Sequence, residues 1–173
     1  MNILTAIKAV ALSILVSSMA HAVGSSDKLG SELDYCKVSY VEKIGGSNGT
    51  YRGQCENDKP HGSGTVTFYN GDKLTGTFIS GAFGGNGVRA SADGNIYEGG
   101  WQKGKRHGQG KYTWAQGSSY VGEWIDDKRH GQGVFKWSNG NRFEGEFRDN
   151  KRFNGKYYTS TGRVYKCRLG QCK

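Results

Sequence analysis

The stretch YEGGWQKGKRHGQGKYTWAQGSS, residues 97–119, is one copy of a pattern that runs through most of the chain. Tyr-x-Gly-x-Trp, a basic turn and His-Gly-x-Gly begin again at Tyr120. In each copy a glycine lies two residues after the first position. A bulky or soft apolar residue lies four residues after that same first position. That first position recurs every 23 residues, at Tyr51, Leu74, Tyr97, Tyr120 and Phe143. A fixed period of this length indicates a repeat architecture.

Alternation within each copy predicts β-strands. Tyr97, Gly99 and Trp101 occupy alternate positions, so they share one face of a strand. After the basic turn, Tyr112 and Trp114 alternate in the same way. The positions between the rings are mostly polar. This pattern is typical of an antiparallel strand pair with one aromatic face and one solvated face.

A turn signal closes each full copy, at Asn70-Gly71, Asp93-Gly94, Gln116-Gly117 and Asn139-Gly140. Asn-Gly favours a two-residue type I′ hairpin turn, because both central residues of that turn need positive φ. A lone hairpin is marginally stable in water. Stacked hairpins bury a continuous row of rings, and we expect a ring of the neighbouring copy to cover the glycine backbone.

These motifs resemble the MORN (membrane occupation and recognition nexus) repeat family. Three copies depart from the pattern, with Cys55 in the tryptophan position of the first, Gly84-Gly85 in place of His-Gly in the second, and Phe153 in place of histidine in the last. The predicted fold is an all-β, single-sheet solenoid of tandem antiparallel β-hairpins, twisted and curved. We assign five repeats to residues 51–164, namely 51–73, 74–96, 97–119, 120–142 and 143–164. The resemblance implies protein–protein assembly, association with anionic lipid headgroups, and homo-oligomers formed through the repeat ends.

The N-terminal residues have the features of a secretory signal peptide. Lys8 precedes a mainly apolar run of 11 residues, Ala9–Met19, and Ala20-His21-Ala22 fits a cleavage site. The run is shorter than the roughly 20 residues that span a bilayer. We therefore predict cleavage of residues 1–22 and a soluble periplasmic or secreted protein. Residues 23–50 form a leader and an N-terminal capping strand over 35–44, and residues 165–173 form a C-terminal cap.

Four cysteines lie near the two ends of the repeats. An even number in an exported chain indicates two disulfides. An open stack keeps its ends apart, so we predict the local pairs Cys36–Cys55 and Cys167–Cys172. Each pair would fasten one terminal strand.

The chain is basic, with 24 Lys and Arg against 15 Asp and Glu among 173 residues, a formal charge of +9. Removing residues 1–22 removes only Lys8 and leaves +8. Such a surface favours anionic partners, and in an exported protein lipid headgroups or acidic envelope polymers are more plausible than nucleic acid. Stacked turns would align the basic residues as a candidate anion-binding stripe about 40 Å long: Lys59, Lys105, Arg106, Lys128, Arg129, Lys151 and Arg152.

The aromatic face is the second candidate site, either as a groove or as core. Its residues are Arg89, Tyr97, Trp101, Tyr112, Trp114, Tyr120, Trp124, Phe135 and Trp137. Arg89 and Ser91 stand where other copies carry two aromatic residues, so this copy either opens a pocket or is a degenerate repeat.

The spacing disfavours catalysis and metal binding. Zinc donors lie about 2.0–2.1 Å from the ion, whereas His107 and His130 fall two strands, or about 10 Å, apart. Their neighbours repeat identically, and no separate nucleophile or acid pair stands beside them. We expect no enzyme activity and no cofactor.

Two functions remain open. The first is a non-catalytic exported scaffold that binds a protein partner through the aromatic face. The alternative is a module that binds phospholipid headgroups or an acidic envelope polymer through the basic stripe.

Overall fold

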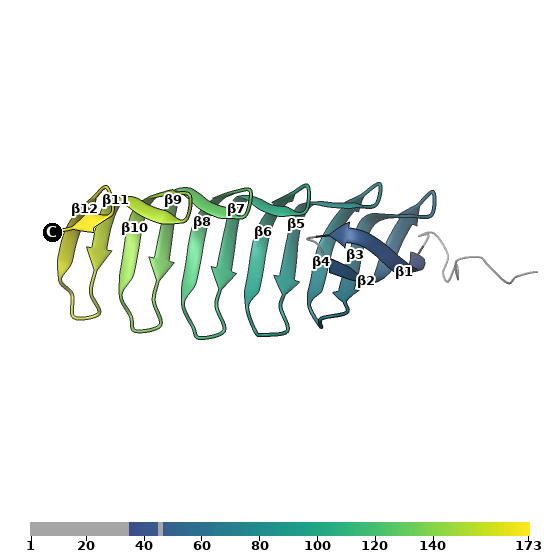
Figure 1. Ribbon diagram of the computed structural model, residues 1–173, viewed down its shortest axis with the longest axis horizontal. Coiled ribbons are helices and arrows are strands. Elements are labelled where there is room, and N and C mark those ends of the chain that lie inside the picture. The colour runs from purple at the N-terminus through teal and green to yellow at the C-terminus, as the bar shows by residue number, and fades with distance from the viewer. Residues whose placement is uncertain (1–34, 45–46) are drawn as a thin grey trace, which may run out of the picture.

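A computed structural model describes residues 35–44 and 47–173, with side chains from residue 49 onward. Thirteen described strands pair in sequence order to form one open antiparallel sheet (Figure 1). They are β1 (Tyr35–Ile44), β2 (Ser47–Glu56), β3 (Lys59–Phe68), β4 (Lys73–Ile79), β5 (Ala82–Ala90), β6 (Ile96–Gln102), β7 (Lys105–Thr113), β8 (Ser119–Ile125), β9 (Lys128–Lys136), β10 (Arg142–Arg148), β11 (Lys151–Tyr158), β12 (Val164–Arg168) and β13 (Gln171–Cys172). The predicted all-β, single-sheet solenoid of hairpins is confirmed.

The register places like residues opposite one another in the central repeats. Gly99 of β6 pairs with Gly110 of β7, which pairs in turn with Gly122 of β8. Tyr112 likewise lies opposite both Tyr97 and Tyr120. Glycines therefore cross the sheet in one row and rings in another, because a fixed repeat length keeps the register constant.

The aromatic rings form a single buried row along one face. Tyr97 and Tyr120 are buried, and each meets the buried Trp124 in an edge-to-face contact at 5.4 and 5.3 Å. These contacts link adjacent repeats, so the core is shared between neighbours. The row continues at both ends through Tyr51, Leu74, Phe78, Phe83, Trp101, Phe143 and Phe147.

The glycine row exists because a ring covers it. A Cβ atom on Gly133 would lie 2.5 Å from the phenol oxygen of Tyr120. Both residues belong to the same repeat, as do Tyr97 and Gly110, which meet in the same way. The prediction that the ring comes from the neighbouring repeat is therefore wrong: each tyrosine covers glycines of its own hairpin.

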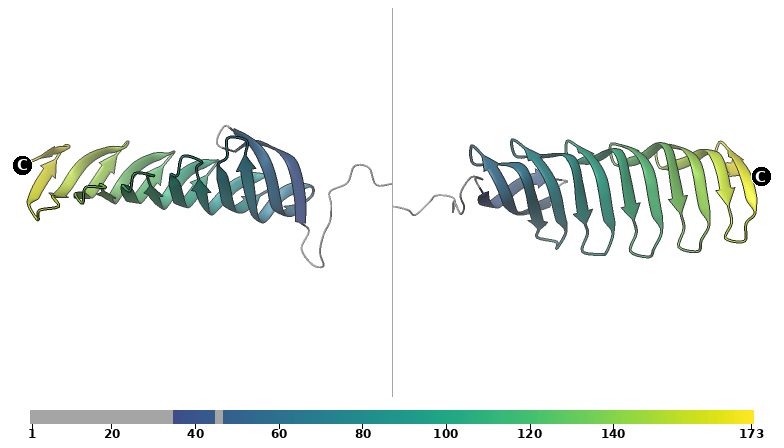
Figure 2. Two further views of the ribbon diagram at one scale, coloured as in Figure 1. Left: turned by 90° about the horizontal axis from the view of Figure 1, so that it is seen from below. Right: turned by 180° about the vertical axis from the view of Figure 1, so that it is seen from behind.

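Two-residue turns join the strands at the end of each hairpin that carries the basic residues. Both turn residues have positive φ, as at Asp126 (48°) and Asp127 (70°), which is the type I′ geometry. A bulge precedes each of the five turns from β2–β3 to β10–β11, such as the one between Gly99 and Trp101 in the β6–β7 pair. Such bulges bend strands, and the turn ends curve relative to the strands in Figures 1 and 2.

The opposite turns differ from the sequence prediction. Of Asn139 and Gly140, only the glycine has positive φ, so this pair is not a type I′ turn. The amide of Gly140 donates to the carbonyl of Trp137 at 3.0 Å, and Trp137 pairs with Asn141 across a three-residue loop. Type I geometry followed by a left-handed glycine fits such loops. The same hydrogen bonds close the loops at Gly71, Gly94, Gly117 and Gly162.

Side chains also connect successive three-residue loops. Asn95 accepts a hydrogen bond from the amide of Ala115 in the next loop at 3.0 Å. Asn141 accepts one from Ser160 at 2.8 Å. Asp72 and Ser118 take the equivalent positions in their repeats. This ladder fixes the spacing of repeats at the edge opposite the basic turns.

The ends of the described sheet agree in part with the sequence predictions. β1 pairs with β2 as the expected capping strand, and Cys167 is bonded to Cys172 as predicted. Cys55 is disulfide-bonded, but the side chain of Cys36 lies outside the described residues, so that pairing stays a prediction. The signal peptide of residues 1–22 and the leader before β1 also lie outside them.

Candidate functional site

The Lys-Arg pairs of the basic turns divide between two surfaces. Lys105 and Lys128 are exposed, whereas Arg106 and Arg129 are half-buried over the aromatic row. Consecutive residues of a strand point to opposite faces, which explains the separation. Lys59 and Lys151 are exposed at the equivalent position, and Arg152 lies over rings. The seven residues therefore do not lie on one surface as the sequence predicted: the lysines are exposed at the turns, and the arginines belong to the aromatic face.

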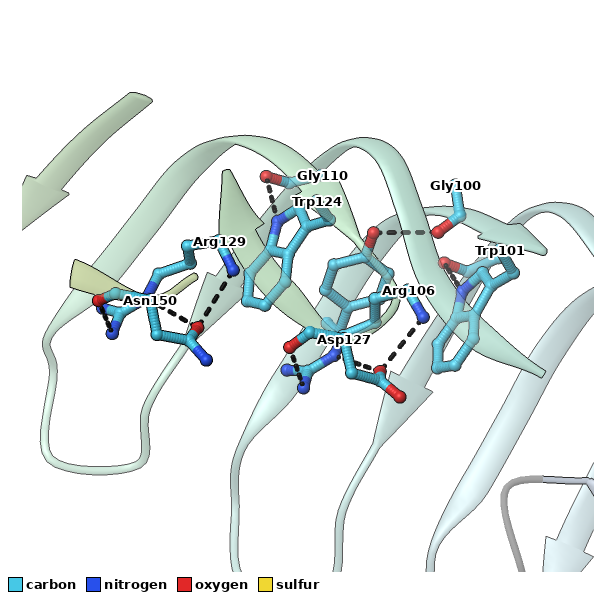
Figure 3. Close-up of polar contacts among 10 residues, drawn as sticks. Gly100, Trp101, Arg106, Gly110, Trp124, Asp127, Arg129 and Asn150 are labelled. Carbon is cyan, nitrogen blue, oxygen red and sulfur yellow. Dashed lines mark hydrogen bonds and ion pairs between the residues drawn. The ribbon is translucent and has the colours of Figure 1, made fainter. Parts of the chain in front are cut away.

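Arg106 is fixed by rings and by an acidic residue of the next hairpin. Its guanidinium carbon lies 4.4 Å from the ring centre of Trp124 and 5.3 Å from that of Tyr112. Its Nε donates to Asp127 Oδ1 at 2.8 Å, and its Nη2 donates to the Asp127 carbonyl at 3.0 Å (Figure 3). The aspartate neutralises this guanidinium while the rings hold it in place.

Arg129 repeats this geometry one hairpin further on, with Asn150 in place of the aspartate. Its Nε and Nη2 donate to Asn150 Oδ1 at 3.4 Å and to the Asn150 carbonyl at 3.0 Å (Figure 3). Burial lowers the pKa of Arg129, and the charge of Arg106 lowers it further. Tyr120 partly opposes this shift. Unlike Arg106, this guanidinium has no carboxylate partner among the described residues.

A hollow of about 540 Å³ lies beside Arg129, and we call it the C-terminal hollow. Its lining combines basic and aromatic side chains with the last turn of the chain. The lining residues are Arg129, Phe135, Trp137, Phe147, Asn150, Lys151, Arg152, Leu169, Gly170 and Gln171. None of them is acidic, so the hollow has a positive charge.

A second hollow of about 320 Å³, the middle hollow, lies at the copy where the sequence left open a pocket or a degenerate repeat. Arg89, Ser91, Trp101 and Tyr112 are part of its lining, together with Tyr97, Gly104, Arg106 and Asp127. Arg89 Nη2 lies 2.7 Å from Asp72 Oδ2, so its charge is compensated as that of Arg106 is. The two hollows therefore differ in charge although the fold around them repeats.

The remaining candidate groove residues fall into two groups. Tyr97, Trp101, Tyr120 and Trp124 are buried and belong to the core. Their accessible neighbours are half-buried rings packed on that core, namely Tyr112, Trp114, Phe135 and Trp137. Only the second group and the arginines offer surface to a ligand.

The buried tyrosines serve as hydrogen-bond donors. Tyr97 donates its phenol proton to the carbonyl of Gly100 at 2.9 Å, and Tyr120 donates to the carbonyl of Glu123 at 3.0 Å. Burial raises the pKa of Tyr97 to about 12, although Arg106 opposes the shift, and burial raises the pKa of Tyr120 further. Both phenols therefore stay protonated at neutral pH.

The histidines of the repeated turns are not brought together into a site. Within the described residues, no group of three or more His, Cys, Asp or Glu side chains is arranged to hold a metal ion. The Nδ1 atom of His107 is buried without a hydrogen-bond partner among the same residues. No helix in this part of the chain has the length and apolar character needed to cross a bilayer.

Sequence reasoning missed the partners of the arginines. Asp127 and Asn150 appear as ordinary turn residues, yet each holds the guanidinium of the preceding hairpin. The signal was present: the second turn residue changes from aspartate to asparagine while the arginine before it is kept. Asp72, the partner of Arg89, was missed for the same reason.

Comparisons with known proteins agree with the repeat pattern. The family model described as MORN repeat matches residues 51–73, 75–96, 97–119, 120–142 and 143–153. No curated protein matches the chain. Among solved structures, the SAS-4 (dCPAP) TCP domain of Drosophila melanogaster, in complex with a proline-rich motif of Ana2 (dSTIL), is similar at 8% identity. The match covers 84% of this chain and 97% of that one with a TM-score of 0.34, which is too low to bear on function.

Proposed function

The chain belongs to the MORN repeat family, and we propose that it is a non-catalytic, exported scaffold that binds a partner protein through its aromatic face. The observation that carries the proposal is the pair of hollows on this face, where half-buried rings alternate with fixed guanidinium groups. Aromatic residues and arginine are the side chains most enriched at protein interfaces. The ion pairs and ring contacts hold the arginines in place, which lowers the entropic cost of binding.

The experiment compares two sets of variants in capture from an envelope extract of the source organism. Trp114→Ala with Trp137→Ala removes exposed ring surface from the aromatic face. Lys105→Ala with Lys128→Ala removes charge from the lysine stripe and leaves the rings intact. A partner retained by the lysine variant and lost by the tryptophan variant supports the proposal, provided that circular dichroism shows both variants to be folded. Loss of the partner by the lysine variant alone contradicts the proposal.

Binding of an anionic surface by the lysine stripe is a second candidate. It is supported by four exposed lysines at equivalent positions, of which Lys128 is paired with Asp149 at 3.2 Å. Each lysine near an anionic membrane contributes about 1 kcal/mol. Co-sedimentation with anionic vesicles or an acidic polymer at low and high salt tests it. Binding at low salt that Lys105→Ala and Lys128→Ala remove would favour this function.

A further inference from the structure

Three successive hairpins carry an arginine at the same position, and each guanidinium lies over rings. Arg106 lies over Trp124, Arg129 lies 5.3 Å from the ring centre of Phe135, and Arg152 lies 5.3 Å from that of Trp137. Equivalent residues are two strands apart, which places them about 10 Å from one another. The guanidiniums therefore form a regular series along the aromatic face.

The acceptor supplied by the following turn weakens along this series. Arg106 has the carboxylate of Asp127 as its partner, and Arg129 has the amide of Asn150. For Arg152, the equivalent turn of the next hairpin contains Gly170, which has no side chain. Positive charge is neutralised at the first position and left uncompensated at the other two.

Asp127 and Asn150 are a matched natural pair. The backbone amide of the preceding arginine donates to Asp127 Oδ1 at 3.1 Å and to Asn150 Oδ1 at 3.0 Å. Their φ angles are 70° and 71°. The exchange thus removes one negative charge and leaves the geometry of the turn unchanged.

The uncompensated charge lies in a recess that is not fully solvated. Arg129 and Arg152 are half-buried and share the C-terminal hollow with Lys151 and the ring of Trp137. A desolvated cation without a counter-charge costs free energy, and a bound anion removes that cost. The middle hollow lacks this driving force because Asp72 and Asp127 already neutralise its arginines.

We propose that the C-terminal hollow binds an acidic, extended segment of a partner protein, with side-chain carboxylates on Arg129 and Arg152. The proposal rests on the scaffold function above and names the chemistry of its partner. A segment in the polyproline II conformation rises about 3.1 Å per residue with three residues per turn, so acidic residues three apart share one face and match the spacing of the guanidiniums. Apolar side chains between them contact Trp137. Lipid headgroups offer no apolar side chain to this half-buried ring.

Fluorescence anisotropy tests the proposal with the purified protein. The probe is a short labelled peptide that carries Glu at every third position and apolar residues between, and its control carries Gln instead of Glu. Asn150→Asp supplies the missing carboxylate in the geometry of Asp127 and is expected to weaken binding about tenfold or more. Asp127→Asn exposes the charge of Arg106 and is expected to strengthen binding. Asp126→Asn removes the same charge from the neighbouring turn residue and serves as the control.

Four results would overturn the assignment. Equal affinity of the Gln peptide would show that carboxylates are not recognised. Unchanged binding by a folded Asn150→Asp variant would show that the charge of Arg129 is not used. Vesicles containing phosphatidylserine that bind as tightly, with the same sensitivity to Asn150→Asp, would assign the hollow to a membrane. Partner capture that depends on Trp137 but not on Asn150 would preserve the scaffold function and reject this inference.

Discussion

The phenol ring of Tyr120 lies against the backbone of Gly133 on the paired strand, where a Cβ atom would be 2.5 Å from the hydroxyl oxygen. Tyr120 is fully buried and donates its proton to the carbonyl of Glu123. The ring cannot move aside without breaking that hydrogen bond and its edge-to-face contact with Trp124. Gly133 is therefore required for space rather than for an unusual φ.

Gly133→Ala is expected to destabilise the fold by about 1–3 kcal/mol, the range for overpacking a tight core. The urea unfolding midpoint measures the effect. Gly84→Ala is the matched control, because a Cβ atom there has no neighbour within 4 Å. This control should be neutral or slightly stabilising. Equal destabilisation by both variants would contradict the role given to the ring.

Asp72 predicts a stability that depends on pH. Its side chain is buried and accepts hydrogen bonds from Arg89 and from the amide of Ala92. Desolvation raises the pKa of Asp72, but these hydrogen bonds outweigh it and hold the pKa below its ordinary value. A lowered pKa in the folded state stabilises the protein above the ordinary carboxyl pKa of about 3.9. That stabilisation is lost as the pH falls through the folded value.

Asp72→Asn should therefore lower the free energy of unfolding by about 1–3 kcal/mol at pH 7. The difference from the wild type should narrow below about pH 4, where the wild-type carboxyl becomes protonated. Urea titrations at several pH values measure it. Asp126→Asn, at an exposed turn residue whose side chain makes no hydrogen bond or ion pair within the described residues, should show no such difference. If the difference in the free energy of unfolding between wild type and Asp72→Asn stays constant down to pH 3, the result argues against a stabilising Asp72–Arg89 pair.

The repeat period predicted the fold because every copy places rings and glycines at the same offsets. Tyr97, Gly99 and Trp101 share a face because alternate residues of a strand point to the same side. The sequence placed the type I′ turn at Asn-Gly, whereas the structure has it at the basic turns, because Asn-Gly also suits the last two positions of a three-residue loop. Asp126-Asp127 carries no glycine, yet both residues adopt positive φ. Short polar side chains tolerate that conformation, which makes the signal weak in a sequence.

The candidate site was only partly predictable. The basic turns were visible, but a run of Lys-Arg letters does not reveal that Arg106 bends onto Trp124 while Lys105 stays in solvent. Consecutive residues of a strand point to opposite faces, which separates the two side chains. Contacts such as Arg106 to Asp127 join residues 21 positions apart, and only the stacked structure brings them together.

Trp124→Phe tests the hydrogen bond that joins adjacent repeats. The indole Nε1 of Trp124 donates to the carbonyl of Gly110 at 3.2 Å (Figure 3). Phenylalanine fits this slot, as Phe147 shows one repeat later. We expect a loss of about 1 kcal/mol, the typical net value of one hydrogen bond. Trp114→Phe is the control, because its indole N–H makes no hydrogen bond among the described residues. A larger effect at Trp114 in thermal unfolding would contradict this assignment.

Replacing both Cys167 and Cys172 by serine tests the C-terminal end. The disulfide joins β12 to β13 across the turn that lines the C-terminal hollow. Closing so short a loop contributes about 2 kcal/mol in the chain-entropy model. Since each repeat contacts only its neighbours, amide hydrogen exchange should quicken over Val164–Arg168 and stay unchanged over Lys105–Thr113. Cys167 ends the glycine row opposite Gly155 and is buried, so the cross-link fixes the last strand over the core. Faster exchange throughout the sheet would show instead that the repeats unfold as one unit.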